Sequence, residues 1–152
     1  MQQITHGLRT KGDMSFEEIT AVVPWIELAE DMGIPLDATQ PGNVRLFKSH
    51  LPWEKVPKGC HYIYIIRDPK DMVVSAYHFL EGWFFESGAI SLREFILAQH
   101  LEAPPAVSYW AHIRSWWPHR RDPNVLFLTY EGMKECFERT VVRVAKFLGS
   151  EP

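Results

Sequence analysis

The chain has 152 residues, of which 46% are hydrophobic and 23% charged, and this suits one soluble globular domain rather than a disordered chain. A formal net charge of -3 excludes a general attraction to nucleic acid or anionic membrane. Its two cysteines, Cys60 and Cys136, are too few and too far apart for a disulfide framework or a CxxC metal site. No stretch approaches the roughly 20 apolar residues of a membrane span, and the first residues lack a signal-peptide pattern. We therefore expect a cytoplasmic protein.

The first part of the chain is predicted to be mostly helix and loop. Residues 1–9 have helical spacing, and Ser15 with Glu18 three residues later has the pattern of a capping box before a further helix. The next expected elements are a short helix over 25–32, a loop over 35–42 and a short strand over 44–49. The helix at the first residue has no N-cap before it, so we expect that part of the domain precedes Met1.

The rest of the chain alternates strands with helices. Tyr62–Ile66 and Asn124–Thr129 are continuous apolar runs, typical of strands buried in a parallel sheet. Helical spacing is found from Val73 to Phe84 and over 91–100, 106–119 and 133–148, the last ending at Gly149. This order predicts an α/β fold with a parallel β-sheet flanked by helices, and residues 1–152 are expected to form a single domain.

An arginine stands at the end of the first of these strands. Arg67 follows Tyr62–Ile66, at the carboxyl end of a strand, where ligand sites of open α/β sheets gather. Asp68 can cap the next helix and Pro69 suits its first turn, so the helix N-terminus points toward the same place. With Ser75 two turns further on, these groups could clamp a phosphate. Alternatively, Arg67 pairs with a nearby carboxylate and Ser75 only packs.

Lys48 and His50 form a second candidate pair, also near a strand end. They lie on the same face of an extended chain. Histidine has an ordinary pKa of about 6.5, which suits a general base near neutral pH, and a lysine beside it could stabilise charge on a transferring group. The pattern alone is weak, because the chain has 7 histidines and most are expected to be surface or packing residues.

Aromatic residues give weaker signals. Tyr130, just after the second buried strand, could stack on a base or bond to it, although Tyr-Glu at a strand-to-helix junction is equally suited to packing and capping. Trp110, Trp116 and Trp117 could line an apolar substrate pocket, but aromatic side chains at helical spacing are more often core. We expect core packing for most of them.

Three motifs occur together in an order typical of one family. They are Lys48-Ser-His-Leu-Pro, Ile66-Arg-Asp-Pro-Lys-Asp-Met-Val-Val-Ser-Ala-Tyr-His-Phe and Val125-Leu-Phe-Leu-Thr-Tyr-Glu-Gly-Met-Lys. With them the chain resembles the cytosolic sulfotransferases from end to end, and the middle motif is the most specific. The resemblance implies a P-loop-NTPase-like sulfotransferase fold, truncated at both ends. It also implies transfer of a sulfuryl group from 3′-phosphoadenosine 5′-phosphosulfate (PAPS), which leaves adenosine 3′,5′-bisphosphate (PAP).

The resemblance also implies roles for the candidate residues. Arg67 and Ser75 match the residues that hold the 3′-phosphate of PAPS, and Tyr130 matches the tyrosine near the adenine. His50 matches the general base, and Lys48 the lysine that stabilises the transferring group. No metal is required. The expected acceptor is a small-molecule phenol, alcohol, sterol or amine, and a homodimer is possible for the full-length family member.

Two family segments have no match in this sequence. One is the phosphate loop of the type Pro-Lys-Ser-Gly-Thr-Thr-Trp, whose amides and lysine hold the 5′-phosphosulfate, and the other is the C-terminal Arg-Lys-Gly segment. The helix at Met1 resembles the helix that follows that loop. We therefore expect a partial domain with weak or absent transfer activity alone; a gene-model error, a fragment and a real truncation all remain open as the reason.

Two other functions are considered. The chain could be a non-catalytic module that binds PAP or PAPS, or an inactive paralogue, although the presence of both His50 and Lys48 argues against this. A nucleotide kinase of the P-loop class shares the general architecture. The kinase is the least favoured function, because the sequence has neither a Walker-type loop nor a recognisable cluster of acidic residues that would bind magnesium.

Overall fold

The computed structural model describes residues 1–42, 44–98 and 108–150. The chain divides into two compact units. Unit 1 consists of Met1–Leu51, Val56–His61 and Met133–Pro152, and unit 2 of Pro52–Lys55 and Tyr62–Gly132. The candidate residues are divided between them, with the Lys-x-His pair in unit 1 and the arginine, serine and tyrosine in unit 2.

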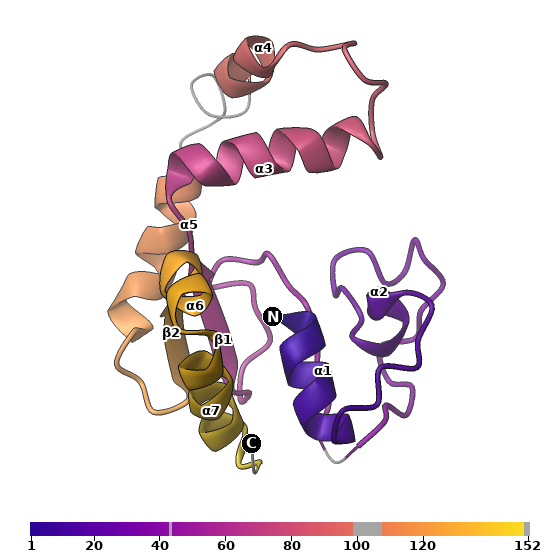
Figure 1. Cartoon of the computed structure of the whole chain (residues 1–152), viewed down its shortest axis with the longest axis vertical. Helices are drawn as coiled ribbons and strands as arrows, with labels where there is room; N and C mark the ends of the chain where they lie inside the picture. Colours follow the sequence, from indigo (N-terminus) through magenta and orange to yellow (C-terminus); the bar gives the residue numbers. More distant parts are fainter. Residues whose placement is uncertain (43, 99–107, 151–152) are drawn as a thin grey trace. The chain divides into compact units, whose positions relative to one another are not determined.

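Unit 2 contains a parallel two-stranded sheet (Figure 1). β1 (Tyr62–Ile66) pairs with β2 (Val125–Thr129) along the full length of both strands. Parallel neighbours need a crossover connection, and it contains α3 (Pro69–Glu81), α4 (Leu92–Ile96) and α5 (Tyr109–Trp116). The predicted α/β fold with a parallel sheet is confirmed, as are both of its strands.

Aromatic rings cover one face of this sheet. Tyr62 and Tyr64 are two residues apart in β1 and so share a face, and Trp116 packs on them with ring centroids 5.5 and 4.9 Å away. Trp116 is only 5% exposed and belongs to the core, as expected. The same expectation is wrong for Trp110 and Trp117, which are 59% and 49% exposed. Trp117 begins a 3₁₀ turn, Trp117–His119, where the helical spacing changes.

The helix after β1 begins where the sequence predicts. Asp68 is its N-cap, with a carboxylate that accepts a hydrogen bond from the Lys70 amide at 2.8 Å, and Pro69 occupies the first turn. The helix ends at Glu81. Phe84 continues the apolar spacing in the sequence but lies beyond the helix and is 72% exposed, so the predicted end of this helix is wrong.

α3 and α4 share a small apolar cluster formed by Val73, Tyr77 and Phe95. α4 starts with a capping box, in which the Ser91 hydroxyl accepts from the Glu94 amide and the Glu94 carboxylate accepts from the Ser91 amide. The helix predicted over 91–100 is confirmed in its first part, and its last two residues lie outside the described residues. The start of the helix predicted over 106–119 also lies outside them.

The C-terminal part contains two helices where one is predicted. α6 (Tyr130–Glu135) and α7 (Phe137–Leu148) are separated by Cys136, which leaves helical geometry with φ −133° and ψ 63°. Apolar spacing continues across this break and therefore does not reveal it. α7 ends at Gly149 in the left-handed region with φ 69°, as predicted.

The predicted capping box at Ser15 is wrong. α1 (Gln2–Thr10) agrees with the first predicted helix, but α2 is short, Ile19–Val22, and begins after Glu18. The Glu18 carboxylate accepts a hydrogen bond from the Thr20 amide at 2.7 Å and so acts as the cap itself. Ser15 instead donates its amide to the Asp13 carboxylate at 2.9 Å, in the local turn that aspartate favours.

The helix predicted over 25–32 and the strand predicted over 44–49 are also wrong. A single parallel bridge joins Trp25 to Lys48, with Ile26 N–H donating to the Lys48 carbonyl at 2.9 Å and Lys48 N–H to the Pro24 carbonyl at 2.8 Å. The backbone at the start of the expected helix therefore bonds to the Lys48 segment instead of starting a helical turn. Turns follow instead, and the loop predicted over 35–42 is confirmed.

A buried arginine connects the segments of unit 1. Arg9 in α1 is 9% exposed, and its guanidinium donates to the carbonyls of Val22 and Val44 at 2.6 and 3.1 Å and to Gln40 Oε1 at 2.6 Å. Its Nη2 lies 3.0 Å from Nδ1 of His6. Because arginine only donates, Nδ1 of His6 must accept and therefore carry no proton.

We predict that His6 makes the protein less stable as the pH falls below about 6.5. Burial, and then the charge of Arg9, lower the pKa of His6, while Asp13 opposes this. In the unfolded chain His6 binds a proton near its ordinary pKa, whereas in the folded chain it binds the proton only at a lower pH. The contribution of His6 to the free energy of unfolding is therefore fully present above the ordinary pKa. It decreases as the pH falls from the ordinary pKa to the lowered pKa of the folded state.

Urea unfolding between about pH 5 and pH 8 measures this effect. The control variant is His6→Gln, which keeps an oxygen acceptor for Arg9 but does not titrate. We expect a shallower pH dependence in this variant than in the wild type. The same slope in both proteins would contradict the prediction.

Candidate functional site

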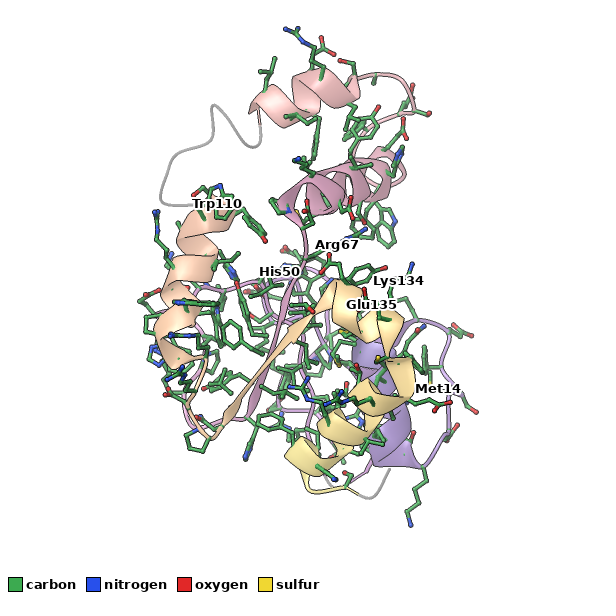
Figure 2. The ribbon with its side chains drawn as sticks, turned by 60° about the vertical axis from the view of Figure 1, so that its left-hand side comes forward. Met14, His50, Arg67, Trp110, Lys134 and Glu135 are labelled. Atoms are coloured by element: carbon green, nitrogen blue, oxygen red, sulfur yellow. The ribbon has the colours of Figure 1, made fainter. Side chains whose placement is uncertain are left out.

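Arg67 lies at the junction between β1 and α3 (Figure 2). Its guanidinium carbon is 4.4 Å from the centroid of the Tyr130 ring, a cation–π contact. Tyr130 is the first residue after β2, so the parallel pairing of the two strands brings the residues that follow them together. Nε of Arg67 is buried and finds no hydrogen-bond partner among the described residues. The site therefore offers a donor that an anion could satisfy, beside an aromatic ring.

The main chain at Arg67 is bonded on both sides. The Tyr109 hydroxyl donates to the Arg67 carbonyl at 2.6 Å, and the Asp68 amide donates to Glu131 Oε1 at 3.0 Å. The bond from Asp68 lowers the pKa of the Glu131 carboxyl, and burial raises the pKa of Tyr109. This arrangement fixes the backbone from which the arginine side chain leaves the sheet.

The alternative in which Arg67 pairs with a carboxylate is wrong within the part of the chain that the structure describes. No carboxylate there lies within ion-pair distance of the guanidinium, and Glu131, the acidic residue beside it, bonds to the Asp68 amide. Ser75 is exposed on α3, so its hydroxyl faces solvent. The N-terminus of α3, with its partly positive dipole end, starts directly after Arg67.

Lys48 and His50 lie beside a tryptophan in unit 1. Nζ of Lys48 is 3.5 Å from the centroid of the Trp25 ring, and the ring centroid of His50 is 5.0 Å from that of Trp25. Burial lowers the pKa of Lys48, while the carboxylates of Glu27 and Glu18 act in the opposite direction. Lys48 is half-buried and His50 is exposed. One aromatic ring thus contacts both members of the predicted pair.

A carboxylate holds the segment that carries His50. Oε1 of Glu27 accepts hydrogen bonds from the His50 amide and, at 3.2 Å, from the Ser49 hydroxyl. The Ser49 hydroxyl also accepts from the Leu51 amide at 3.0 Å. Glu27 therefore holds Ser49 and His50 directly, and Leu51 through the Ser49 hydroxyl. These bonds fix the backbone conformation at His50, the candidate base.

No group of three or more His, Cys, Asp and Glu side chains suited to a metal ion is found in residues 1–42, 44–98 and 108–150. In the same ranges, no helix is long and apolar enough to cross a bilayer. The candidate groups that the described residues offer include a stacked arginine, a serine hydroxyl, and a histidine and a lysine on a tryptophan.

Comparison with known proteins gives the family. The family model described as "Sulfotransferase domain" matches residues 1–152. The chain belongs to the sulfotransferase family. The resemblance seen in the sequence motifs is therefore confirmed, and this sulfotransferase chain is a partial domain.

Curated sulfotransferases match most of the chain. Human "Sulfotransferase 1E1" is 31% identical over 151 residues, which cover 95% of this chain and 50% of the relative. Mouse "Sulfotransferase 4A1" is 36% identical over 127 residues, 75% of this chain and 45% of the relative. Rabbit "Amine sulfotransferase" is 34% identical over 110 residues, 68% of this chain and 36% of the relative. The chain thus spans about half the length, or less, of these curated relatives.

Solved structures agree with the fold. Retinol dehydratase, in a crystal structure with androsterone and the inactive cofactor PAP, matches with a TM-score of 0.79 at 22% identity, covering 99% of this chain and 56% of that one. Mouse sulfotransferase SULT7A1, solved with PAP, matches with a TM-score of 0.62 at 32% identity, covering 71% and 41%. The predicted sulfotransferase fold is confirmed.

Sequence reasoning missed several residues of these sulfotransferase segments. Trp25 and Glu27, which contact Lys48 and the His50 segment, were part of a predicted helix and carried no functional signal. Tyr109 lies in the helix predicted over 106–119, and Glu131 belongs to a Tyr-Glu pair that is equally suited to packing and capping, so neither is singled out by the sequence. The adjacency of Glu131 to a candidate site residue was the one signal that could have found it.

We predict that Glu27→Ala frees the His50 segment. The loss of a charged acceptor should make amide exchange at His50 faster by about tenfold, because a hydrogen bond to a charged group contributes about 1.5–3 kcal/mol. Hydrogen exchange followed by NMR measures this directly. Glu27→Gln keeps an acceptor oxygen and serves as the control, with a smaller increase expected. Equal exchange rates in the wild type and Glu27→Ala would show that Glu27 does not hold the segment.

Proposed function

We propose that this chain carries the nucleotide end of the donor site and the general-base segment of a PAPS-dependent sulfotransferase. The acceptor would be a hydroxyl or amine of a small molecule: a phenol, an alcohol, a sterol or an amine. The observation that supports this most is Arg67, with a buried, unpartnered Nε and its guanidinium on the Tyr130 ring, in a chain of the sulfotransferase family. PAP in two solved relatives supports the choice of nucleotide.

At the nucleotide end, Arg67 and Ser75 would bind the 3′-phosphate. A guanidinium presents two parallel N–H donors to a phosphate, and the hydroxyl of Ser75 adds a further donor. The N-terminus of α3 favours negative charge at the same edge of the sheet. Tyr130 would lie near the adenine and keeps the guanidinium in place through its ring. Together these groups fit a nucleotide that carries a phosphate on its ribose.

At the reacting end, His50 would take the proton from the acceptor's hydroxyl or amine as that group attacks the sulfur atom. The bond between sulfur and the phosphate oxygen breaks, and PAP leaves. Lys48 would offset the negative charge that shifts to the leaving oxygen. Its ammonium on the Trp25 ring is partly removed from water, which strengthens its field on a neighbouring charge.

We propose that this polypeptide alone has weak or no transfer activity. No segment of its sequence matches the Pro-Lys-Ser-Gly-Thr-Thr-Trp loop that would hold the 5′-phosphosulfate. We also propose that residues 1–152 belong to one sulfotransferase domain, that the protein acts in the cytoplasm, and that the full-length form can be a homodimer.

A second candidate is a non-catalytic module that binds PAP or PAPS. The same missing loop favours it, because Arg67, Ser75 and Tyr130 are present for the 3′-phosphate and the adenine, while no segment matches the loop for the 5′-phosphosulfate. The two candidates make the same prediction for nucleotide binding. They differ in turnover, which only the first allows.

We predict that Arg67→Ala weakens PAP binding by about 10- to 100-fold, because it removes charge-assisted hydrogen bonds to the phosphate. Isothermal titration calorimetry with PAP measures this. The matched control is Arg93→Ala, which removes an exposed positive charge from α4 in the same unit and should bind PAP as the wild type does.

Turnover is then tested with labelled PAPS and a panel of phenols, alcohols, sterols and amines. Slow transfer that disappears in His50→Ala supports the enzyme, and binding without transfer supports the non-catalytic module. Absence of PAP binding by the wild type would overturn both, and rapid transfer would overturn the expected low activity.

A further inference from the structure

We propose that Tyr109 and Glu131 are positioning residues for nucleotide recognition. They hold the carbonyl and the amide of the Arg67–Asp68 peptide, and so set the direction in which the Arg67 side chain leaves the sheet. This inference rests on the proposed function, because it takes Arg67 as the residue that binds the 3′-phosphate. All the groups involved belong to unit 2.

The Arg67–Asp68 peptide falls between two regular elements and belongs to neither. The ladder of β1 ends at Ile66, and the first turn of α3 uses the Asp68 carbonyl, which accepts from Met72 N–H at 2.8 Å. Pro69 has no N–H to offer. The regular elements thus leave the Arg67 carbonyl, in a half-buried residue, and the Asp68 amide, in an exposed one, free to bond to side chains elsewhere.

Side chains of two different helices supply these partners. The Tyr109 hydroxyl, at the start of α5, donates to the Arg67 carbonyl at 2.6 Å. Glu131, in the first turn of α6, accepts from the Asp68 amide at 3.0 Å. A peptide unit is planar, so its carbonyl and amide turn together. Rotation of this plane would break both bonds at once, and the plane is therefore locked.

Glu131 also leaves the guanidinium available. It follows Tyr130, whose ring lies on the guanidinium of Arg67, so two adjacent residues contact the arginine side chain and the amide of the next residue, Asp68. The hydrogen bond that the Asp68 amide donates to Glu131 lowers the pKa of its carboxyl, and the charge of Arg67 does so to a smaller extent. Both favour the ionised form of Glu131. Its bonded oxygen faces the peptide rather than the guanidinium, whose Nε stays without a partner.

The test compares two nucleotides that differ at the 3′ position, PAP and adenosine 5′-monophosphate. We predict that Tyr109→Phe and Glu131→Ala each weaken PAP binding by about two- to tenfold, the value of one net hydrogen bond. Binding of adenosine 5′-monophosphate should be unchanged, because Arg67 does not contact a phosphate in it. Glu131→Gln keeps an acceptor oxygen and should retain most of the affinity for PAP.

The matched control is Glu135→Ala, which removes an exposed carboxylate from the same helix and should bind both nucleotides as the wild type does (Figure 2 labels Glu135). An equal loss for both nucleotides would overturn the inference, because it would indicate a general loss of structure. Unchanged PAP binding in Tyr109→Phe and Glu131→Ala would also overturn it, while leaving the proposed function standing. A wild type that binds no PAP would instead overturn the proposed function itself.

A measurement on the wild type does not depend on how the variants fold. The NMR shift of the Asp68 amide should follow the ionisation of Glu131, with a midpoint below the ordinary pKa of a glutamate because the folded state favours the carboxylate. Below that midpoint the bond weakens. Because the Asp68 carboxyl also ionises in acid, the Glu131 side-chain carboxyl carbon is followed in parallel. An Asp68 amide whose shift does not share the midpoint of that carbon would show that Glu131 does not hold it, and would overturn the inference.

Discussion

The parallel, in-register pairing of β1 with β2 determines whether the arginine site exists. The pairing places Ile66 opposite Thr129, so that the next residue along each strand, Arg67 and Tyr130, arrives at the same edge of the sheet. A shift of one residue would move Tyr130 by about 3.3 Å along the strand direction, enough to lose the 4.4 Å contact with the guanidinium. An antiparallel pairing would send the two residues to opposite edges.

Unit 1 relies on side chains rather than on strand pairing. Its loops are connected by Arg9, whose guanidinium bonds to two carbonyls and a glutamine, and its Lys48–His50 segment by one bridge and the Glu27 carboxylate. Gly42 packs tightly against Arg9, because a Cβ at residue 42 would lie 2.8 Å from the Arg9 carbonyl oxygen. Its φ of 75° also lies in the left-handed region that favours glycine. The backbone bonds that a sheet would supply are made by individual polar groups.

These two kinds of construction explain what the sequence could predict. The buried strands, the Asp68 cap and the left-handed Gly149 depend on neighbours a few residues away, and they were predicted. The partners of Tyr109 and Glu27 lie 42 and 23 residues away, so no local pattern shows them. The bridge of Trp25 with Lys48 is also long-range, and it explains why local spacing predicted a helix and a strand that do not form. Arg67, Tyr130, Lys48 and His50 are predicted as site residues because each stands in a motif.

Arg67 combines a bonded main-chain carbonyl with an incompletely bonded side chain. Its carbonyl and the next amide both have partners, whereas its buried Nε has none among the described residues. A buried donor without an acceptor costs about 1–3 kcal/mol of stability. The unpartnered Nε of Arg67 therefore destabilises the free protein. An anion that supplies the acceptor removes this cost only in the bound state. Binding is thereby coupled to stability, because a ligand that contacts only the folded state raises the free energy of unfolding. In the proposed function, the same feature that makes Arg67 unfavourable in the free chain would strengthen its contact with a phosphate.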